Sequence, residues 1–180
     1  MKNSILPIAI FVTTLISSLQ LTAQEFKSLD KSPMDMAAFP SSYKISDKIV
    51  KVIYSRPQLK GRDLVKLAPP EKIWRTGANE AAEITFYKDV VFGGKALKSG
   101  TYSIFTIPSL NGDWTVIINR AKNVWGSYYY KQNQDVIRVF GKVTKTEKNI
   151  EAFSMMFDKN MTLKMGWGKT IISVPIEKTL

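Results

Sequence analysis

The segment from Trp74 to Glu80 gathers the side chains best suited to binding a ligand. Arg75, Asn79 and Glu80 place a guanidinium, an amide and a carboxylate around Gly77. We expect this polar, glycine-containing segment to be a loop, and loops on rigid scaffolds carry most binding residues. Arg75 would grip a carboxylate or phosphate through two parallel hydrogen bonds, while Asn79 and Glu80 would hold sugar hydroxyls.

The same residues admit a structural interpretation. Arg75 and Glu80 would then pair with each other, or with Arg56 and Asp135, and Asn79 would cap a turn. Arg56 belongs to the candidate ligand site in the first interpretation and to these ion pairs in the second. The sequence leaves both interpretations open.

A second candidate is a group of aromatic residues beside Gly126. Trp125 and Tyr128 are followed by two further tyrosines, in a segment that we expect to connect two strands. Exposed rings stack on sugar rings or on peptide side chains. The alternative, which we favour, is that these rings close one end of the core. Three other tryptophans and four methionines are expected to pack inside the protein: Trp74, Trp114, Trp167, Met155, Met156, Met161 and Met165.

The composition excludes several kinds of catalysis. The chain has no histidine and no cysteine, which excludes Ser-His-Asp and cysteine nucleophiles and makes a zinc site implausible. No Asp-rich loop with calcium-binding spacing is visible. We therefore predict no catalytic residue, no metal and no cofactor, and lean against an enzyme. One catalytic alternative stays open, in which Glu80 with Asp135 or Glu83 forms the carboxylate pair of a carbohydrate hydrolase.

The first 23 residues have the pattern of a signal peptide. Lys2 precedes an uncharged, largely apolar stretch from Asn3 to Ala23, which favours export and removal over an uncleaved anchor. A lipoprotein anchor would need a cysteine. We expect the protein in the periplasm or outside the cell, with the outer-membrane surface left open. The remaining chain would consist of an extended lead-in over residues 24–46 and a single β domain over residues 47–180.

The charge of the chain is strongly basic. Without the leader, 25 basic and 15 acidic residues leave a net charge of +10. Such an excess would attract anionic envelope components, including lipopolysaccharide phosphates and acidic glycans. The basic residues are scattered rather than clustered in one block, so we expect no binding to nucleic acid. The sequence does not indicate an oligomeric state.

Alternating apolar residues and turn signals predict an all-β fold. Gly93-Gly94 and Asn111-Gly112 are hairpin-turn signals, and the strands around them should form an antiparallel meander. Residues 59–70 would form a loop with room for one helical turn. The spacing favours a β-sandwich or a jelly-roll-like barrel of about eight strands. The predicted strands cover residues 47–56, 83–92, 102–107, 113–119, 135–145, 151–158, 161–167 and 169–176.

Several motifs together resemble one known family. They include Val-Ile-Tyr-Ser-Arg-Pro-Gln-Leu-Lys-Gly-Arg at 52–62, Ile-Trp-Arg-Thr-Gly-Ala-Asn-Glu-Ala at 73–81, Phe-Gly-Gly-Lys at 92–95 and Trp-Gly-Ser-Tyr at 125–128. On these motifs the chain resembles the exported bacterial family catalogued as domain of unknown function 2911, common in the Bacteroidetes. The resemblance covers most of the exported chain and implies no established activity. The chain departs from the family at Pro69-Pro70-Glu71 and at Ala81-Ala82-Glu83, on either side of the candidate loop.

These observations lead to one hypothesis and two alternatives. The hypothesis is an exported, non-catalytic β domain that binds a glycan or an envelope component through the loop from Arg75 to Glu80 and the nearby aromatic residues. The alternatives are a carbohydrate hydrolase with a carboxylate pair and a structural protein of the envelope. Two close carboxylates in an open cleft would favour the hydrolase, and a shallow groove lined by arginine and aromatic residues would favour ligand binding. A buried Arg75–Glu80 ion pair would favour the structural protein.

Overall fold

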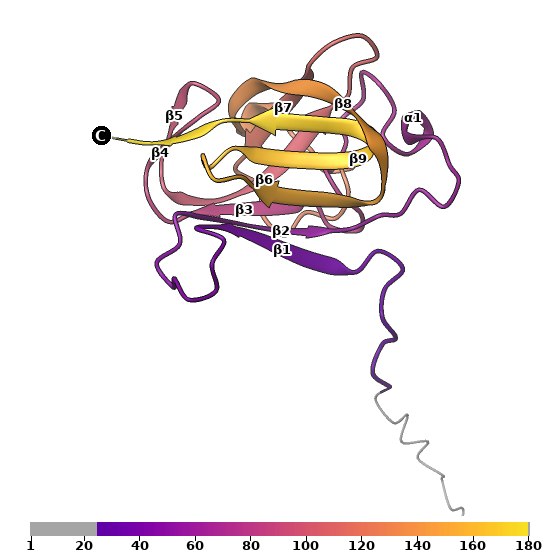
Figure 1. Cartoon of the computed structure of the whole chain (residues 1–180), viewed down its shortest axis with the longest axis horizontal. Helices are drawn as coiled ribbons and strands as arrows, with labels where there is room; N and C mark the ends of the chain where they lie inside the picture. The colour runs from indigo at the N-terminus through magenta and orange to yellow at the C-terminus, as the bar shows by residue number, and fades with distance from the viewer. Residues whose placement is uncertain (1–24, 180) are drawn as a thin grey trace, which may run out of the picture.

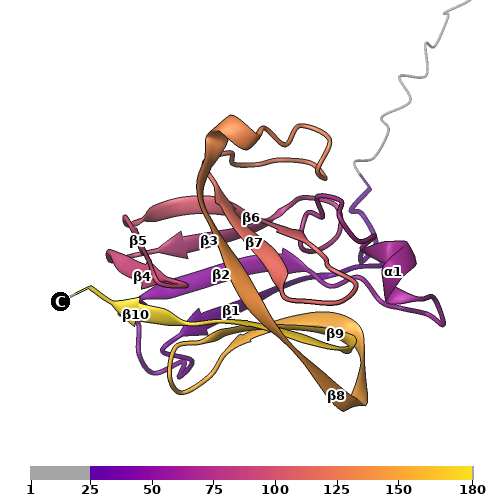
Figure 2. The same cartoon turned by 90° about the horizontal axis from the view of Figure 1, so that it is seen from above.

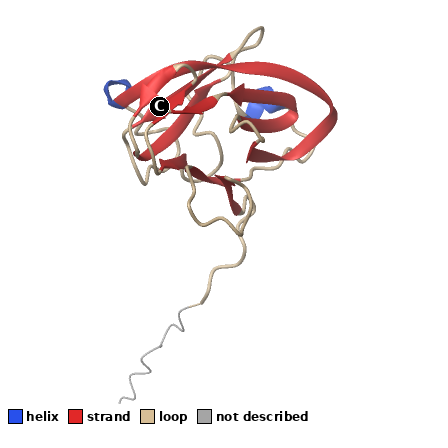
Figure 3. Ribbon diagram, turned by 60° about the vertical axis from the view of Figure 1, so that its left-hand side comes forward, coloured by secondary structure: helices blue, strands red, loops and turns tan. Residues whose placement is uncertain are grey.

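The computed structural model describes residues 25–179 and confirms an all-β protein. Figure 3 shows strands throughout and two short helical turns. The predicted signal peptide, residues 1–23, lies outside the described residues. In chain order the elements are β1 (Met34–Phe39), β2 (Val50–Ser55), α1 (Leu64–Leu67), β3 (Ala82–Phe86), β4 (Val90–Phe92), β5 (Lys95–Leu97), β6 (Gly100–Ile107), β7 (Trp114–Asn119), the 3₁₀ turn η1 (Gln132–Gln134), β8 (Asp135–Phe157), β9 (Leu163–Val174) and β10 (Ile176–Lys178).

One antiparallel sheet of seven strands carries the fold, in the order β1-β2-β3-β6-β7-β8-β9. The predicted meander is present, because β3, β6 and β7 are neighbours in this sheet. A small sheet in the order β10-β4-β5 holds the segment inserted between β3 and β6. The predicted lead-in contains β1, which pairs along its whole length with β2. The helical turn expected between residues 59 and 70 is α1.

The strand predicted over residues 83–92 is in fact two strands. The chain turns at residues 87–89, where the Asp89 carboxylate accepts hydrogen bonds from the Ser99 N–H (2.8 Å) and the Lys98 ammonium (2.7 Å). The apolar alternation continues through this turn, so the sequence pattern hides it. The Gly93-Gly94 turn is confirmed between β4 and β5, where both glycines have positive φ.

The single long strand β8 replaces two of the predicted strands. Its first part pairs with β7 and its later part pairs with β9. The register against β9 shifts between Lys145 and Ile150 and again between Ile150 and Ser154, so the strand bends there. Figure 2 shows β8 crossing from one layer of the fold to the other. In the same way β9 replaces the last two predicted strands.

This bend folds the sheet over itself and encloses the core. The later part of β8 and the strand β9 cover the face formed by β2, β3, β6 and β7 (Figures 1 and 2). The hydroxyl of the buried Tyr54 on β2 donates to the Met155 carbonyl (3.2 Å) and accepts from the Met155 N–H (2.8 Å) on β8. Backbone hydrogen bonds from Phe153 to Pro57 and from Leu59 to Glu151 also hold the later part of β8 against the segment that follows β2.

Three tryptophans lie in the core, as predicted. The exposed fractions of Trp74, Trp114 and Trp167 are 5%, 5% and 2%, and the rings of Trp74 and Trp167 stack at 5.4 Å. Three of the four methionines expected inside are buried. Met156 is the exception, with 54% of its surface exposed, because alternate residues of β8 face solvent beyond the covered layer.

The outer face of the sheet, which is turned away from β9, is covered only in part. Phe105 of β6 and Ile117 of β7 lie on this face beneath the loop of residues 120–131, which contributes Val124 and Tyr130 to a second, smaller core. Beside it, Ile53 of β2 is exposed. Figure 2 shows this loop along one side of the sheet, opposite β9. Among the described residues, no helix is long and apolar enough to cross a membrane.

Candidate functional site

The segment predicted as a loop, Trp74 to Glu80, forms no regular strand: Trp74 and Glu80 make isolated β-bridges, and the residues between them are a loop held against the sheet. Thr76 is buried, and its hydroxyl lies within hydrogen-bond distance of two acceptors, the Trp74 carbonyl (3.4 Å) and the Thr106 hydroxyl (3.3 Å). Gly77 lies so close to β2 that a Cβ atom there would meet the Ser55 carbonyl oxygen at 3.2 Å. The loop is therefore positioned by buried contacts rather than left free in solvent.

The loop is also joined to the second predicted candidate, the aromatic segment. The Ala81 N–H donates to the Val124 carbonyl (2.8 Å), and the Gly126 N–H donates to the Asn79 carbonyl (2.9 Å). Between these bonds, Glu80 and Trp125 form an antiparallel β-bridge. Residues paired in this way present their side chains on the same face. The structure thus brings together two candidate segments that are far apart in the sequence.

Most of the aromatic segment faces solvent, which corrects the expectation that it closes the core. Trp125, Tyr128 and Tyr129 have exposed fractions of 55%, 82% and 72%. Only Tyr130 packs inward, with its ring 5.1 Å from that of Phe105. Tyr130 covers this part of the second core, and the rings of Trp125, Tyr128 and Tyr129 remain outside it.

A groove of about 300 Å³ opens beside the loop, where the covering segment of residues 120–131 ends. Its polar lining includes the two carboxylates of Glu80 and Glu83, Ser55 and Asn123. The Glu83 carboxylate accepts a hydrogen bond from the Asn123 N–H (2.6 Å), and this bond holds the edge of the aromatic segment against β3. The remaining lining comes from Met34, Ile53, Tyr54 and Ala81.

Glu80 and Arg75 do not form the ion pair that a structural interpretation requires. Within residues 25–179, neither side chain takes part in an ion pair, and Glu80 is exposed. The Nε atom of Arg75 is buried without a hydrogen-bond partner. Arg75 does not line the groove. Asn79 adopts a positive φ of 59°, and it contributes its carbonyl to the contact with Gly126.

Arg56 holds parts of the fold together and does not line the groove. Its guanidinium donates to the Asp35 carboxylate (3.0 Å), to the Ser154 hydroxyl (2.7 Å) and to the Phe153 carbonyl (3.1 Å). These bonds connect β1 and β2 with the later part of β8. Arg56 is therefore not brought together with the other candidate ligand residues.

Asp135 is likewise engaged elsewhere. Its carboxylate accepts hydrogen bonds of 2.7 Å from Asn119, Tyr130 and Arg138, and only 9% of its side chain is exposed. Burial, together with the neighbouring Asp135 carboxylate, raises the pKa of Tyr130 to about 12. The cluster fixes the start of β8 beneath the aromatic segment. It leaves Glu83, not Asp135, as the carboxylate that shares a groove with Glu80.

Sequence reasoning missed the amide and hydroxyl groups of the groove. Asn123 lies just before the aromatic segment and has a positive φ of 55°, but a single asparagine gives no sequence signal for such a position. Ser55 and Ile53 belong to a strand whose outer face becomes a groove wall only when the loop of residues 120–131 packs beside it. Among the described residues, no three acidic side chains gather as a metal ion would require.

The arrangement offers an aromatic face next to hydrogen-bond acceptors. An exposed indole presents a flat apolar surface, and carboxylates accept strong hydrogen bonds from hydroxyl groups. In comparisons with known proteins, a family model described as "Protein of unknown function (DUF2911)" matches residues 32–176. No curated protein and no solved structure matches the chain.

Proposed function

The chain belongs to the DUF2911 family, whose function is unknown, and we propose that it is a non-catalytic domain that binds a neutral glycan. The binding surface consists of the groove and the exposed aromatic side chains next to it. The observation that carries this proposal is the bridge between Glu80 and Trp125, because it places an exposed indole beside one of the two carboxylates that line the groove.

The chemistry of the groove favours an uncharged, hydroxyl-rich ligand. The indole would stack on the face of a sugar ring, while Glu80 and Ser55 would bond to its hydroxyl groups. The two carboxylates would repel an acidic glycan at short range, although the chain as a whole is basic. The anionic ligand suggested by the net charge therefore does not fit this groove.

The first experiment is isothermal titration of the purified chain with neutral oligosaccharides of glucose, mannose and N-acetylglucosamine, with oligogalacturonate as the acidic comparison. Trp125→Ala should weaken binding of a neutral oligosaccharide about tenfold, since an aromatic contact contributes roughly 1.5 kcal/mol. Both the stability and the fold should survive, because Trp125 is more than half exposed.

Tyr87→Ala is the matched control. Tyr87 is also an exposed aromatic residue, at 48%, but it lies at the opposite end of β3 from the groove. Its loss should leave binding unchanged. If every neutral oligosaccharide fails to bind, or if the Trp125 and Tyr87 variants weaken binding equally, the proposed surface is wrong.

A second candidate function, carbohydrate hydrolysis, is favoured by one observation: Glu80 and Glu83 line the same groove. Glycoside hydrolases use two carboxylates, one as an acid and the other as a base or nucleophile. An assay for released reducing ends on the same oligosaccharides separates the two functions. Activity that disappears in both Glu80→Gln and Glu83→Gln would establish the hydrolase, whereas binding without turnover supports the non-catalytic domain.

We also propose that the protein is exported and acts in the periplasm or at the cell surface. This rests on the signal-peptide pattern of residues 1–23 alone. Mass spectrometry of the protein from fractionated bacterial cells tests it. A periplasmic or extracellular species that starts near Gln24 is the expected result, and a cytoplasmic species that starts at Met1 contradicts it.

A further inference from the structure

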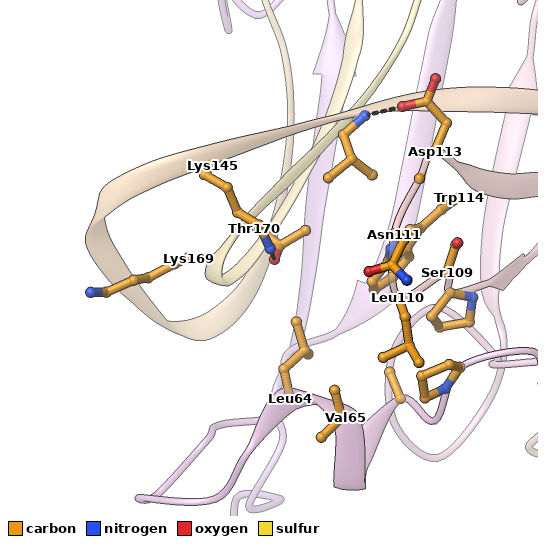
Figure 4. Close-up of a pocket in the computed structure, with 15 residues that line it drawn as sticks. Leu64, Val65, Ser109, Leu110, Asn111, Asp113, Trp114, Lys145, Lys169 and Thr170 are labelled. Carbon is orange, nitrogen blue, oxygen red and sulfur yellow. Dashed lines mark hydrogen bonds between the residues drawn. The ribbon is translucent and has the colours of Figure 1, made fainter.

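A larger cavity of about 530 Å³ lies at the other end of β7 from the aromatic segment. It is enclosed by α1, by the connection between β6 and β7, and by the hairpin of β8 and β9 (Figure 4). Its size is in the range of pockets that hold small molecules. The groove and this cavity share no lining residue.

The walls of this cavity are mainly apolar, and part of this apolar surface is exposed. Leu64 and Val65 of α1 form one wall, and Leu110 forms the opposite wall. Val65 and Leu110 have exposed fractions of 50% and 69%. Trp114 and Ala68 line the cavity from the core side. An apolar ligand group would cover side chains that now face water.

The strand side of the cavity is basic. Lys145 extends toward Thr170, and its ammonium group lies 3.3 Å from the Thr170 hydroxyl (Figure 4). Lys169 is at the rim, with its ammonium directed away from the apolar walls. Within residues 25–179, neither lysine forms an ion pair.

One carboxylate is present, and it is already engaged. An oxygen of Asp113 accepts a hydrogen bond from the Val143 N–H (2.7 Å), as Figure 4 shows. Two ammonium groups against one carboxylate leave the lining with a net positive charge. Both lysines are exposed, so they attract an anion as surface charges do.

From this combination we infer a second binding site, for a small aliphatic carboxylate. The carboxylate would accept hydrogen bonds from both the Lys145 ammonium and the Thr170 hydroxyl, which lie next to each other, and its chain would cover Leu64, Val65 and Leu110. Phosphate-headed lipids offer related chemistry, but a carboxylate has two oxygens, and the end of the cavity offers two adjacent donors, one ammonium and one hydroxyl.

The test is titration of the full chain with butanoate, hexanoate and octanoate, followed by isothermal calorimetry and by backbone amide chemical shifts. Affinity should rise with chain length by up to about fourfold for each methylene that becomes buried. The shifts should concentrate at residues 110–113 and 169–170, and should leave residues 123–130 unchanged. Hexanol, which has the chain without the charge, should bind at least tenfold more weakly than hexanoate.

Lys145→Met removes the ammonium and keeps the aliphatic stem, and should weaken octanoate binding at least tenfold. Lys142→Met is the matched control, because it causes the same change in net charge on the same strand. Lys142 does not line the cavity, whereas Val143 and Lys145 do, as expected for the opposite face of a strand.

Three results would overturn the assignment. One is no binding of octanoate at millimolar concentration, and another is equal loss of binding in the Lys142 and Lys145 variants. The third is binding to vesicles of phosphatidylglycerol without binding to octanoate, which would indicate attraction of the whole basic surface to a membrane. None of these results depends on whether the groove at Glu80 binds a glycan.

Discussion

Gly126→Ala is expected to destabilise the protein by about 2 kcal/mol and to disturb the aromatic segment. Gly126 has a φ of 65°, a left-handed conformation that costs other residues about 1–2 kcal/mol. An added Cβ would also lie 2.8 Å and 2.9 Å from two ring carbons of Tyr128. Moving that ring away from its preferred rotamer adds about 0.5–1.5 kcal/mol.

Gly94→Ala separates these two contributions. Gly94 has a φ of 81°, also left-handed, but no atom lies within 4 Å of the position its Cβ would take. It should therefore cost only the conformational part, about 1 kcal/mol. Alanine restricts the unfolded chain equally in both variants, so that effect cancels when they are compared.

Thermal unfolding followed by circular dichroism measures both variants. For a domain of this size, 1 kcal/mol corresponds to a shift of about 2–4 °C in Tm, so Gly126→Ala should lie several degrees below Gly94→Ala. Adding Tyr128→Ala to Gly126→Ala should recover the difference, because it removes the ring that the Cβ meets. Equal costs for the two glycine variants would show that the Tyr128 ring does not lie over Gly126, and the described arrangement of the aromatic segment would be wrong.

Two further predictions concern Tyr54 and Tyr130. Tyr54→Phe should lower the free energy of unfolding by about 1–3 kcal/mol, because it leaves the backbone N–H and carbonyl of Met155 without their hydrogen bonds to the Tyr54 hydroxyl. Tyr102→Phe is the control: it loses a more exposed hydrogen bond to the Lys98 carbonyl and should cost under about 0.5 kcal/mol. Similar urea midpoints for the two variants would contradict this prediction. Burial and the Asp135 carboxylate raise the pKa of Tyr130 to about 12 from its ordinary 10.0, so its contribution to stability should be complete below pH 10 and be lost as the pH rises toward 12. Tyr130→Phe should flatten this alkaline decline in urea midpoints, and an unchanged decline would show that Tyr130 is not its source.

Local signals in the sequence predicted much of the fold. Gly93-Gly94 forms the expected turn because glycine, which has no Cβ atom, adopts a positive φ without steric cost. The strands β6 and β7 follow from apolar runs that end at Pro108 and begin after Asn111-Gly112. By contrast, the division between β3 and β4 depends on Asp89, whose hydrogen bonds to residues 98 and 99 are made only after the chain has turned.

The candidate site could be predicted only in part, for a related reason. The loop at residues 76–81 has a local signature, and it lies where a loop was expected. Its meeting with Trp125 depends on backbone bonds between distant segments, which no local pattern reveals. The partners in the ion pairs could not be predicted from the sequence either. Arg56 pairs with Asp35, and Asp135 pairs with Arg138.

The position of the groove follows from how the outer face of the sheet is covered. The bend of β8 brings β9 over the inner face, whereas on the outer face the loop of residues 120–131 shields Phe105 and Ile117. Beside Asn123 of this loop, Ile53 of β2 and Glu83 of β3 line the groove instead of being covered. A groove results because one more layer of side chains would be needed to cover these strands. A ligand in the groove would extend the cover by stacking on Trp125, so the same incomplete layer explains both the exposed indole and the space beside it.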